Sequence, residues 1–430
     1  MAKTTGDLLD DIISAEFAEA KDLSKEDSTV KGWIDSGNYA LNYICSKKFN
    51  GGYPLHHITM LAGKSGVGKS MLPMIAAKDK IFSKIIIFDT EGGGSGASLA
   101  EFVGAPKDKI RIIPIKSLDC YKVKKADNKI EGIKDSDFPS NGKTETDTYI
   151  YHMGLNLAIK KILYALEYNH TEDETLIIID SLSNLVSSRV LAGGFDMAYT
   201  NQLLNQLFSC MDSTLEGAKT TVLIAGKVYT DVNNPYNTDG IIKGGESVIY
   251  NPSLILNLTS LQDNPEISDA ELKEEKEQRK TGLGASLKTV RARVRKSRFG
   301  TEGRNAWVVL DATYGLTRTS GLFQLLCDFS VCVKNGTRYT IPGVIVDEKG
   351  EPKPFFKKNF PEIFNEDHEK YIEKLIPIME QKEEEIKNKR MNLDINDTDE
   401  APSDEEMTTT DILNAMEAER EVEADKLIEN

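Results

Sequence analysis

The chain has 430 residues, 40% of them hydrophobic, which is long enough for two or three domains and apolar enough for a sizeable core. This composition excludes a wholly disordered protein. No segment approaches the roughly 18 uncharged apolar residues of a membrane span, and the first residues are too acidic for a secretory signal peptide. We therefore expect a cytoplasmic protein with no membrane partner.

The net charge of −15 is concentrated at the C-terminal end of the sequence. Residues 394–430 hold 14 acidic and 2 basic side chains, a net charge of −12. The preceding 393 residues carry a net charge of only −3, so the overall charge does not exclude a nucleic-acid partner. The five cysteines are scattered and contain no C-x-x-C pair, which indicates neither a disulfide framework nor a zinc site.

In chain order, residues 1–28 are expected to hold a short amphipathic helix, because Leu9, Ile13 and Phe17 fall on one helical face. Continuous apolar runs then recur, and helix-length segments such as 151–166 and 201–215 separate several of them. The predicted strands are residues 58–62, 85–88, 176–179, 222–225 and 254–258. This pattern predicts an α/β fold with a mostly parallel, twisted sheet flanked by helices.

Changes in composition suggest the domain boundaries. Residues 29–320 form the predicted core, and its polar, lysine-rich stretch at about 119–148 is typical of a surface insertion. Residues 321–393, which are punctuated by proline, form a predicted small C-terminal subdomain. Residues 394–430 are expected to be an acidic, disordered tail.

Residues 63–70, GKSGVGKS, fit the phosphate-loop pattern G-x-x-x-x-G-K-[ST] between a predicted strand and a predicted helix. Glycines let backbone N–H groups converge on phosphates, Lys69 supplies a cation, and the Ser70 hydroxyl can ligate Mg²⁺. The predicted nucleotide contacts are Gly63, Lys64, Ser65, Gly66, Val67, Gly68, Lys69, Ser70 and Met71.

Two carboxylates follow other predicted strands. Asp180 ends the strand TLIIID, where such nucleotide-binding folds hold the metal, and it is the second predicted Mg²⁺ residue. Glu91 lies just beyond the strand at 85–88, where a carboxylate can orient an attacking water. A capping role for Asp180 and a solvated turn for Glu91 are the alternatives.

The combination of these motifs resembles the RecA-type recombinases, most closely the phage UvsX branch. It comprises the phosphate loop, FDTE at 88–91, DSLSNL at 180–185 and the glycine pair at 244–245. The SGL sequence at 320–322 is also similar.

The resemblance covers roughly residues 30–340 and implies an ATP-dependent DNA strand-exchange enzyme with a RecA-type nucleotide-binding core. Such a protein forms helical filaments on single-stranded DNA, pairs it with homologous duplex DNA, and hydrolyses ATP with Mg²⁺ in a DNA-dependent way. A single-strand-binding protein, a recombination mediator and the cytoplasm of a bacterial host are the corresponding partners and location.

By resemblance, Glu91 corresponds to the family's catalytic carboxylate. Lys227 stands where the family has a γ-phosphate sensor, often Gln or His, so a cation would perform the sensing here. Lys296 and Arg298 correspond to cations that reach the neighbouring subunit's γ-phosphate. The family's adenine-stacking aromatic is Ser98 in this sequence, which leaves the preference for ATP over other nucleotides open.

The resemblance also implies two DNA-binding loops, at 187–200 and 231–246; two ordinary surface loops are the alternative. Their predicted contacts are Arg189, Gly193, Gly194, Tyr236, Lys243, Gly244 and Gly245. The basic stretch 288–304 alternates apolar and cationic residues. That alternation also fits an amphipathic edge strand with a solvated cationic face.

Two other functions share the expected core. A ring helicase usually needs a large N-terminal domain, for which the 62 residues before the phosphate loop leave little room. An assembly or mediator protein could use ATP only as a structural ligand, but Glu91, Lys69 and Asp180 favour hydrolysis.

Overall fold

In the computed structural model, the described residues are 30–91, 95–114, 120–123, 130–133, 148–150, 173–185, 197–215, 219–230, 240–244, 247–261, 287–311 and 315–397. The chain divides into two compact units, Met1–Ile376 and Pro377–Asn430. The helices predicted within residues 1–28 and at 151–166 lie outside the described residues.

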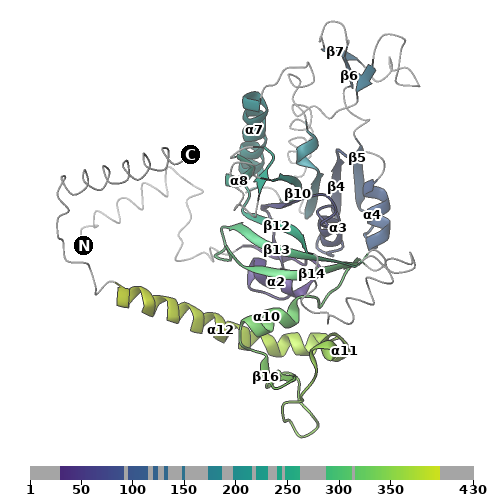
Figure 1. Ribbon diagram of the computed structural model, residues 1–430. Helices are drawn as coiled ribbons and strands as arrows, with labels where there is room; N and C mark the ends of the chain where they lie inside the picture. The colour runs from purple at the N-terminus through teal and green to yellow at the C-terminus, as the bar shows by residue number, and fades with distance from the viewer. Residues whose placement is uncertain are drawn as a thin grey trace, which may run out of the picture. The chain divides into compact units, whose positions relative to one another are not determined.

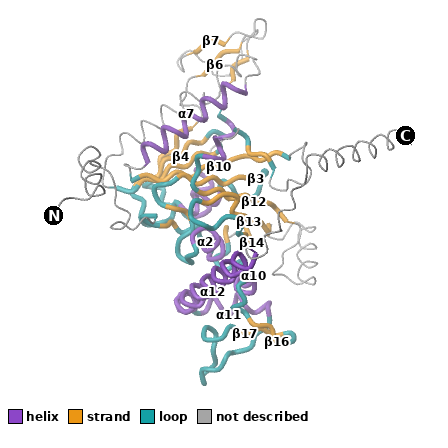
Figure 2. The backbone as a smooth tube through the Cα atoms, turned by 90° about the vertical axis from the view of Figure 1, so that its left-hand side faces the viewer, coloured by secondary structure: helices purple, strands orange, loops and turns teal. Residues whose placement is uncertain are grey.

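A large sheet forms the centre of the first unit (Figures 1 and 2). Among the described residues its strand order is β15-β14-β13-β12-β3-β10-β9-β4-β5, and β11 pairs with β10. The bounds are β3 Ile58–Gly63, β4 Lys84–Asp89, β5 Ile110–Pro114, β9 Thr175–Asp180, β10 Thr220–Tyr229, β11 Ile241–Ile242, β12 Leu254–Leu261, β13 Leu287–Ser297, β14 Asn305–Asp311 and β15 Gly315–Leu316. The strands from β12 through β5 are parallel, and β13, β14 and β15 run antiparallel to their neighbours. The predicted α/β fold with a mostly parallel sheet is confirmed.

All five predicted strands are present, because their continuous apolar sequences suit strands that are covered on both faces. β3, for example, is buried along its whole length. One face packs against helix α7, Met197–Leu215, which contains the predicted helix at 201–215. Leu207, Phe208 and Met211 of α7 are fully buried in a cluster with sheet residues such as Ile177 and Ile224.

Helices cover both faces of the sheet. Figure 1 shows α7 and α8 (Ser247–Tyr250) on one side, and α3 (Met71–Ala76) and α4 (Ser95–Val103) on the other. Helix α2, Tyr39–Ser46, packs near β14, and the Asn38 side chain caps it by accepting a hydrogen bond from the Leu41 amide at 2.8 Å.

The edge-strand interpretation of the basic stretch is wrong. β13 lies inside the sheet, hydrogen-bonded to β12 on one side and to β14 on the other. The alternation itself holds: Val290, Ala292 and Val294 are fully buried, whereas the intervening arginines are partly exposed. Alternation reports one solvated face, but it does not show whether a strand has one neighbour or two.

The predicted surface insertion contains a small antiparallel sheet that the sequence did not indicate. β6, Cys120–Val123, lies between β7, Ile130–Ile133, and β8, Thr148–Ile150. These strands form a sheet separate from the central one. Two short antiparallel pairs complete the described strands: β1 (Trp33–Ile34) with β2 (Tyr53–Pro54), and β16 (Val333–Asn335) with β17 (Arg338–Thr340).

The segment after the sheet contains several helices besides the β16–β17 pair. It contains α10 (Leu322–Asp328), the 3₁₀ turn η4 (Lys357–Asn359), α11 (Phe360–Glu366) and α12 (His368–Asp397). Phe323, Phe360 and Phe364 form a chain of ring contacts, with centroids 5.3 and 5.1 Å apart. α12 continues through Pro377 to Asp397, past the expected end of the subdomain at residue 393. Within the described part of the chain, no helix combines the length and the apolar character needed to cross a membrane.

Candidate active site

The predicted phosphate loop, Glu91, Asp180 and Lys227 come together where four parallel strands end. Strand register aligns Lys227 on β10 with Gly63 on β3, and Asp89 on β4 with Asp180 on β9. Because carboxyl ends of parallel strands share one edge of a sheet, motifs far apart in the sequence converge there.

The phosphate loop connects β3 to α3, and its glycines are required by its shape. Gly66 and Gly68 have φ of +76° and +88°, in the left-handed region that favours glycine. At Gly63, a Cβ atom would lie 2.6 Å from the carbonyl oxygen of Leu258 on β12. The loop is therefore tightly curved and packed directly against neighbouring strands.

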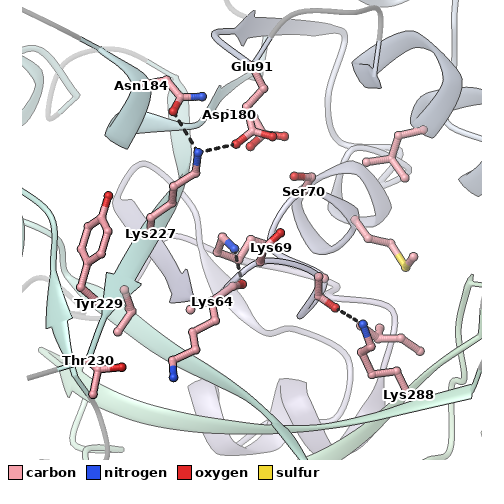
Figure 3. Close-up of a pocket in the computed structure, with 18 of the residues that line it drawn as sticks. Lys64, Lys69, Ser70, Glu91, Asp180, Asn184, Lys227, Tyr229, Thr230 and Lys288 are labelled. Carbon is pink, nitrogen blue, oxygen red and sulfur yellow. Dashed lines mark hydrogen bonds and ion pairs between the residues drawn. The ribbon is translucent and has the colours of Figure 1, made fainter.

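This loop borders a cavity of about 980 Å³ (Figure 3). The predicted residues that line the cavity are Gly63, Lys64, Ser65, Gly66, Gly68, Lys69, Ser70, Met71, Glu91, Asp180 and Lys227. Val67 is instead buried at 2% exposure and anchors the loop from behind.

Lys69 lies inside the curve of the loop. Its ammonium donates a hydrogen bond to the Lys64 carbonyl at 2.5 Å, and the side chain is largely buried. Burial lowers the pKa of Lys69, while the carboxylates of Glu91 and Asp180 oppose that shift. A phosphate in this position would offer the ammonium a charged partner in place of a neutral carbonyl.

The Ser70 hydroxyl and the Asp180 carboxylate face each other across the base of the cavity. Burial raises the pKa of Asp180; its hydrogen bond with Ser70 opposes this, and nearby Glu91 and Asp89 raise it further. A divalent cation would compensate for this concentration of carboxylates. Hard oxygen donors of this kind fit Mg²⁺, which binds few protein ligands and usually keeps water and phosphate oxygens. Among the described residues, no cluster of three or more His, Cys, Asp or Glu side chains offers a metal cage.

Glu91, which lies beside Asp180, forms an ion pair with Lys227 at the wall of the cavity (Figure 3). The Lys227 ammonium lies 3.2 Å from a Glu91 carboxylate oxygen and donates to the Asn184 amide oxygen at 2.9 Å (Figure 3). The backbone N–H of Lys227 donates to the Ser183 hydroxyl at 2.9 Å. Lys227 is thereby connected to both the Glu91 segment and the turn η3, Leu182–Asn184, that follows Asp180.

Of the predicted DNA-contacting residues, Lys243 and Gly244 are described; Arg189, Gly193, Gly194, Tyr236 and Gly245 lie outside the described residues. The Lys243 ammonium donates to the Ser183 carbonyl at 2.8 Å, and its backbone N–H donates to the Lys227 carbonyl at 3.1 Å. Burial and the Lys227 ammonium lower the pKa of Lys243. The end of the predicted second loop is therefore hydrogen-bonded to the wall of the cavity.

Lys296 and Arg298 lie away from this cavity. Lys296 is in register with Ile255, next to the start of β12, at the amino-terminal edge of the parallel strands. Its ammonium donates to the carbonyls of Ile249, at 3.1 Å, and Tyr250, and Arg298 donates to the Asn251 carbonyl at 3.3 Å. Both cations thus hold carbonyls at the C-terminal end of α8, where positive charge is favourable.

Sequence reasoning missed Asn184, Tyr229 and Lys288 as residues that line the cavity. Asn184 lies within the DSLSNL motif, four residues after Asp180, so the sequence could have predicted that it also lies near the cavity. Lys288 arrives from β13, and no spacing along the chain indicates that contact.

Comparison with known proteins gives one line of support for this arrangement. The chain is 22% identical to "Protein RecA" of Streptococcus parasanguinis over 248 residues, which cover 57% of this chain and 60% of that protein. The chain thus matches less than two thirds of the length of this relative. No protein-family model matches the chain. The match supports a distant relationship to the RecA-type proteins.

Proposed function

We propose that this protein is an ATP-dependent, RecA-type recombinase, similar to the phage UvsX branch, that assembles as a helical filament on single-stranded DNA. The observation that carries the proposal is the convergence of a complete phosphate loop, Glu91 and Asp180 with Lys227 around one cavity. DNA strand exchange with homologous duplex DNA, a single-strand-binding protein or mediator as partner, and action in a bacterial cytoplasm belong to the same proposal.

The residues of the cavity divide the chemistry of ATP hydrolysis among them. Loop N–H groups and Lys69 bind the β- and γ-phosphates, and Ser70 and Asp180 hold Mg²⁺. When bound there, Mg²⁺ would offset the negative charge that develops during phosphoryl transfer. Glu91 orients the attacking water as the general base.

In this proposal, Lys227 links nucleotide binding at the cavity to DNA binding at the second loop. A γ-phosphate would compete with Glu91 and Asn184 for the Lys227 ammonium, and that exchange would free Glu91 to contact water. The Lys227 backbone is bonded to Lys243, at the end of the predicted second DNA loop. A change at the cavity therefore has a direct hydrogen-bonded route to that loop.

A ring helicase or a non-hydrolysing ATP-binding assembly protein would share the loop and the sheet. The ion-paired Glu91 supports a hydrolysing protein, since a structural ATP site needs no carboxylate poised at the γ-phosphate end.

Measuring ATP hydrolysis with and without single-stranded DNA tests the proposal. Wild-type protein should be stimulated by DNA, and Lys69→Ala should lose nucleotide-dependent DNA binding because the phosphate cation is gone. Glu91→Gln should bind ATP and DNA but hydrolyse at least about tenfold more slowly, because the amide is a poor base. Glu101→Gln, the same change at an exposed residue of α4, is the matched control. Wild-type hydrolysis by Glu91→Gln would refute the catalytic assignment.

A further inference from the structure

A second lysine reaches the phosphate loop from another part of the sheet. Lys288, near the start of β13, is in register with Leu310 of β14. Its ammonium donates a hydrogen bond to the Gly66 carbonyl at 2.7 Å. Leu310 supports the same loop, since a Cβ atom at Gly68 would meet its side chain at 2.5 Å. In Figure 3, Lys288 approaches the loop from the side away from Glu91 and Asp180.

The geometry of the peptide between Gly66 and Val67 shows what this contact can do. Among the described residues, the only cis bond joins Asp180 to Ser181, so this peptide is trans. In a trans peptide the C=O and N–H point in opposite directions. The Val67 N–H therefore points away from the Lys288 ammonium, and it belongs to the loop whose N–H groups cradle phosphate.

A cation on the carbonyl affects the N–H at the other side of the same peptide. It draws electron density toward the oxygen, which makes the N–H a stronger donor, and it fixes the orientation of the peptide plane. The left-handed φ of Gly66 makes this orientation dependent on glycine, and the buried Val67 side chain holds the other end. The orientation of this peptide is thus set by the Lys288 hydrogen bond, by the backbone conformation of Gly66 and by the buried Val67 side chain.

We propose that Lys288 is a positioning residue for nucleotide binding, acting through the Gly66–Val67 peptide from outside the loop. This inference rests on the proposed ATP-binding function. Because Lys288 contacts neither Glu91 nor Lys227, it affects nucleotide affinity and leaves the hydrolytic step unchanged. The ligand it favours is a nucleoside di- or triphosphate, whose β-phosphate lies within the loop.

Nucleotide affinity and steady-state kinetics of the full-length protein test the inference. Lys288→Met removes the hydrogen bond from the charged ammonium to the Gly66 carbonyl. The variant should therefore weaken Mg·ADP binding, and raise the KM for ATP, by about tenfold, which is the size of effect expected for one hydrogen bond that involves a charged group. The kcat at saturating ATP should stay within about twofold, because interactions made equally in ground and transition states alter KM alone. Lys288→Arg, which keeps a cationic donor, should restore most of the affinity.

The matched control is Lys84→Met, which removes an exposed lysine at the first residue of β4 in the same sheet. Unchanged Mg·ADP affinity in Lys288→Met, or equal losses in Lys288→Met and Lys84→Met, would overturn the inference. A fall in kcat with unchanged KM would also overturn it. Failure of the wild-type protein to bind Mg·ADP would instead refute the proposed function itself, so the two failures are distinguishable.

Discussion

Lys227 and Glu91 illustrate how one contact can matter for function more than for stability. Their side chains are 38% and 41% exposed, and such exposed ion pairs contribute at most about 1 kcal/mol to folding. Breaking this ion pair therefore costs little folding free energy, which suits a contact that a γ-phosphate is proposed to displace. Asn184 gives the ammonium a second partner during that exchange.

Asp180 is predicted to reduce the stability of the nucleotide-free protein. Burial raises its pKa above the unfolded value, so its favourable contribution is complete below the unfolded pKa and is lost as pH rises through the folded pKa. At neutral pH the ionised form is disfavoured by burial and by Glu91 and Asp89. Asp180→Asn should therefore raise stability at pH 7, by roughly 1 kcal/mol, and lower Mg²⁺-dependent hydrolysis.

Thermal melting of wild type and Asp180→Asn, without nucleotide, at pH 7 and at pH 4 checks this. The difference in melting temperature should be larger at pH 7, because a larger fraction of Asp180 is protonated, and therefore uncharged, at pH 4. A variant less stable than wild type at pH 7 would contradict the prediction.

At the residue scale, the sequence predicted groups that belong to local motifs. The phosphate loop, Glu91 and Asp180 could be found because each follows an apolar strand at a recognisable spacing. The bonds of Lys227 to Glu91 and of Lys288 to Gly66 join residues more than 130 positions apart. Such contacts depend on the order of strands in the sheet, which the sequence pattern alone does not specify.

Strand β13 connects two regions of proposed function. Lys288 and Lys296 are eight residues apart on it, a separation of about 27 Å in a strand. Lys296 and Arg298 are therefore far from the phosphate loop of their own chain. This separation supports the proposal that they act on a neighbouring subunit, after leaving the α8 carbonyls that they hold here.

Mixing two inactive variants tests this action in trans. Replacing both Lys296 and Arg298 with Ala should leave folding intact but remove cooperative, DNA-stimulated hydrolysis. Adding Lys69→Ala subunits should restore part of the activity, since one variant supplies an intact phosphate loop and the other supplies the cations. No recovery at any mixing ratio would count against the prediction, and circular dichroism of each variant checks folding.

At the element scale, the predicted strands were found because burial on both faces requires continuous apolar sequence. β6, β7 and β8 were missed because each is only three or four residues long and lies in or beside a polar, lysine-rich stretch. Their order in the small sheet depends on pairing between strands, which the sequence pattern does not specify. The interior position of β13 was missed because it depends on β12 and β14 as neighbours.

The charge distribution of the whole molecule predicts an effect of the C-terminal sequence. Residues 398–430, beyond α12, hold 12 acidic and 2 basic side chains, a net charge of −10. A tethered polyanion competes with DNA for cationic residues at high effective concentration. Truncation after Asp397 should therefore speed association with single-stranded DNA, most clearly at low salt, where charges are least screened.

Stopped-flow association of full-length and truncated protein at two salt concentrations measures this effect. Identical association rates at both concentrations would eliminate autoinhibition. A role in solubility or in docking a partner protein would then remain for the acidic sequence.

Assembly of the full-length protein on DNA tests the central claim most directly. A head-to-tail interface that does not close generates a helix, whereas a ring helicase closes. Electron microscopy with single-stranded DNA and a slowly hydrolysed ATP analogue should show helical filaments, which should be absent without nucleotide. Closed rings, or no assembly on DNA under conditions in which the protein binds nucleotide, would contradict the account.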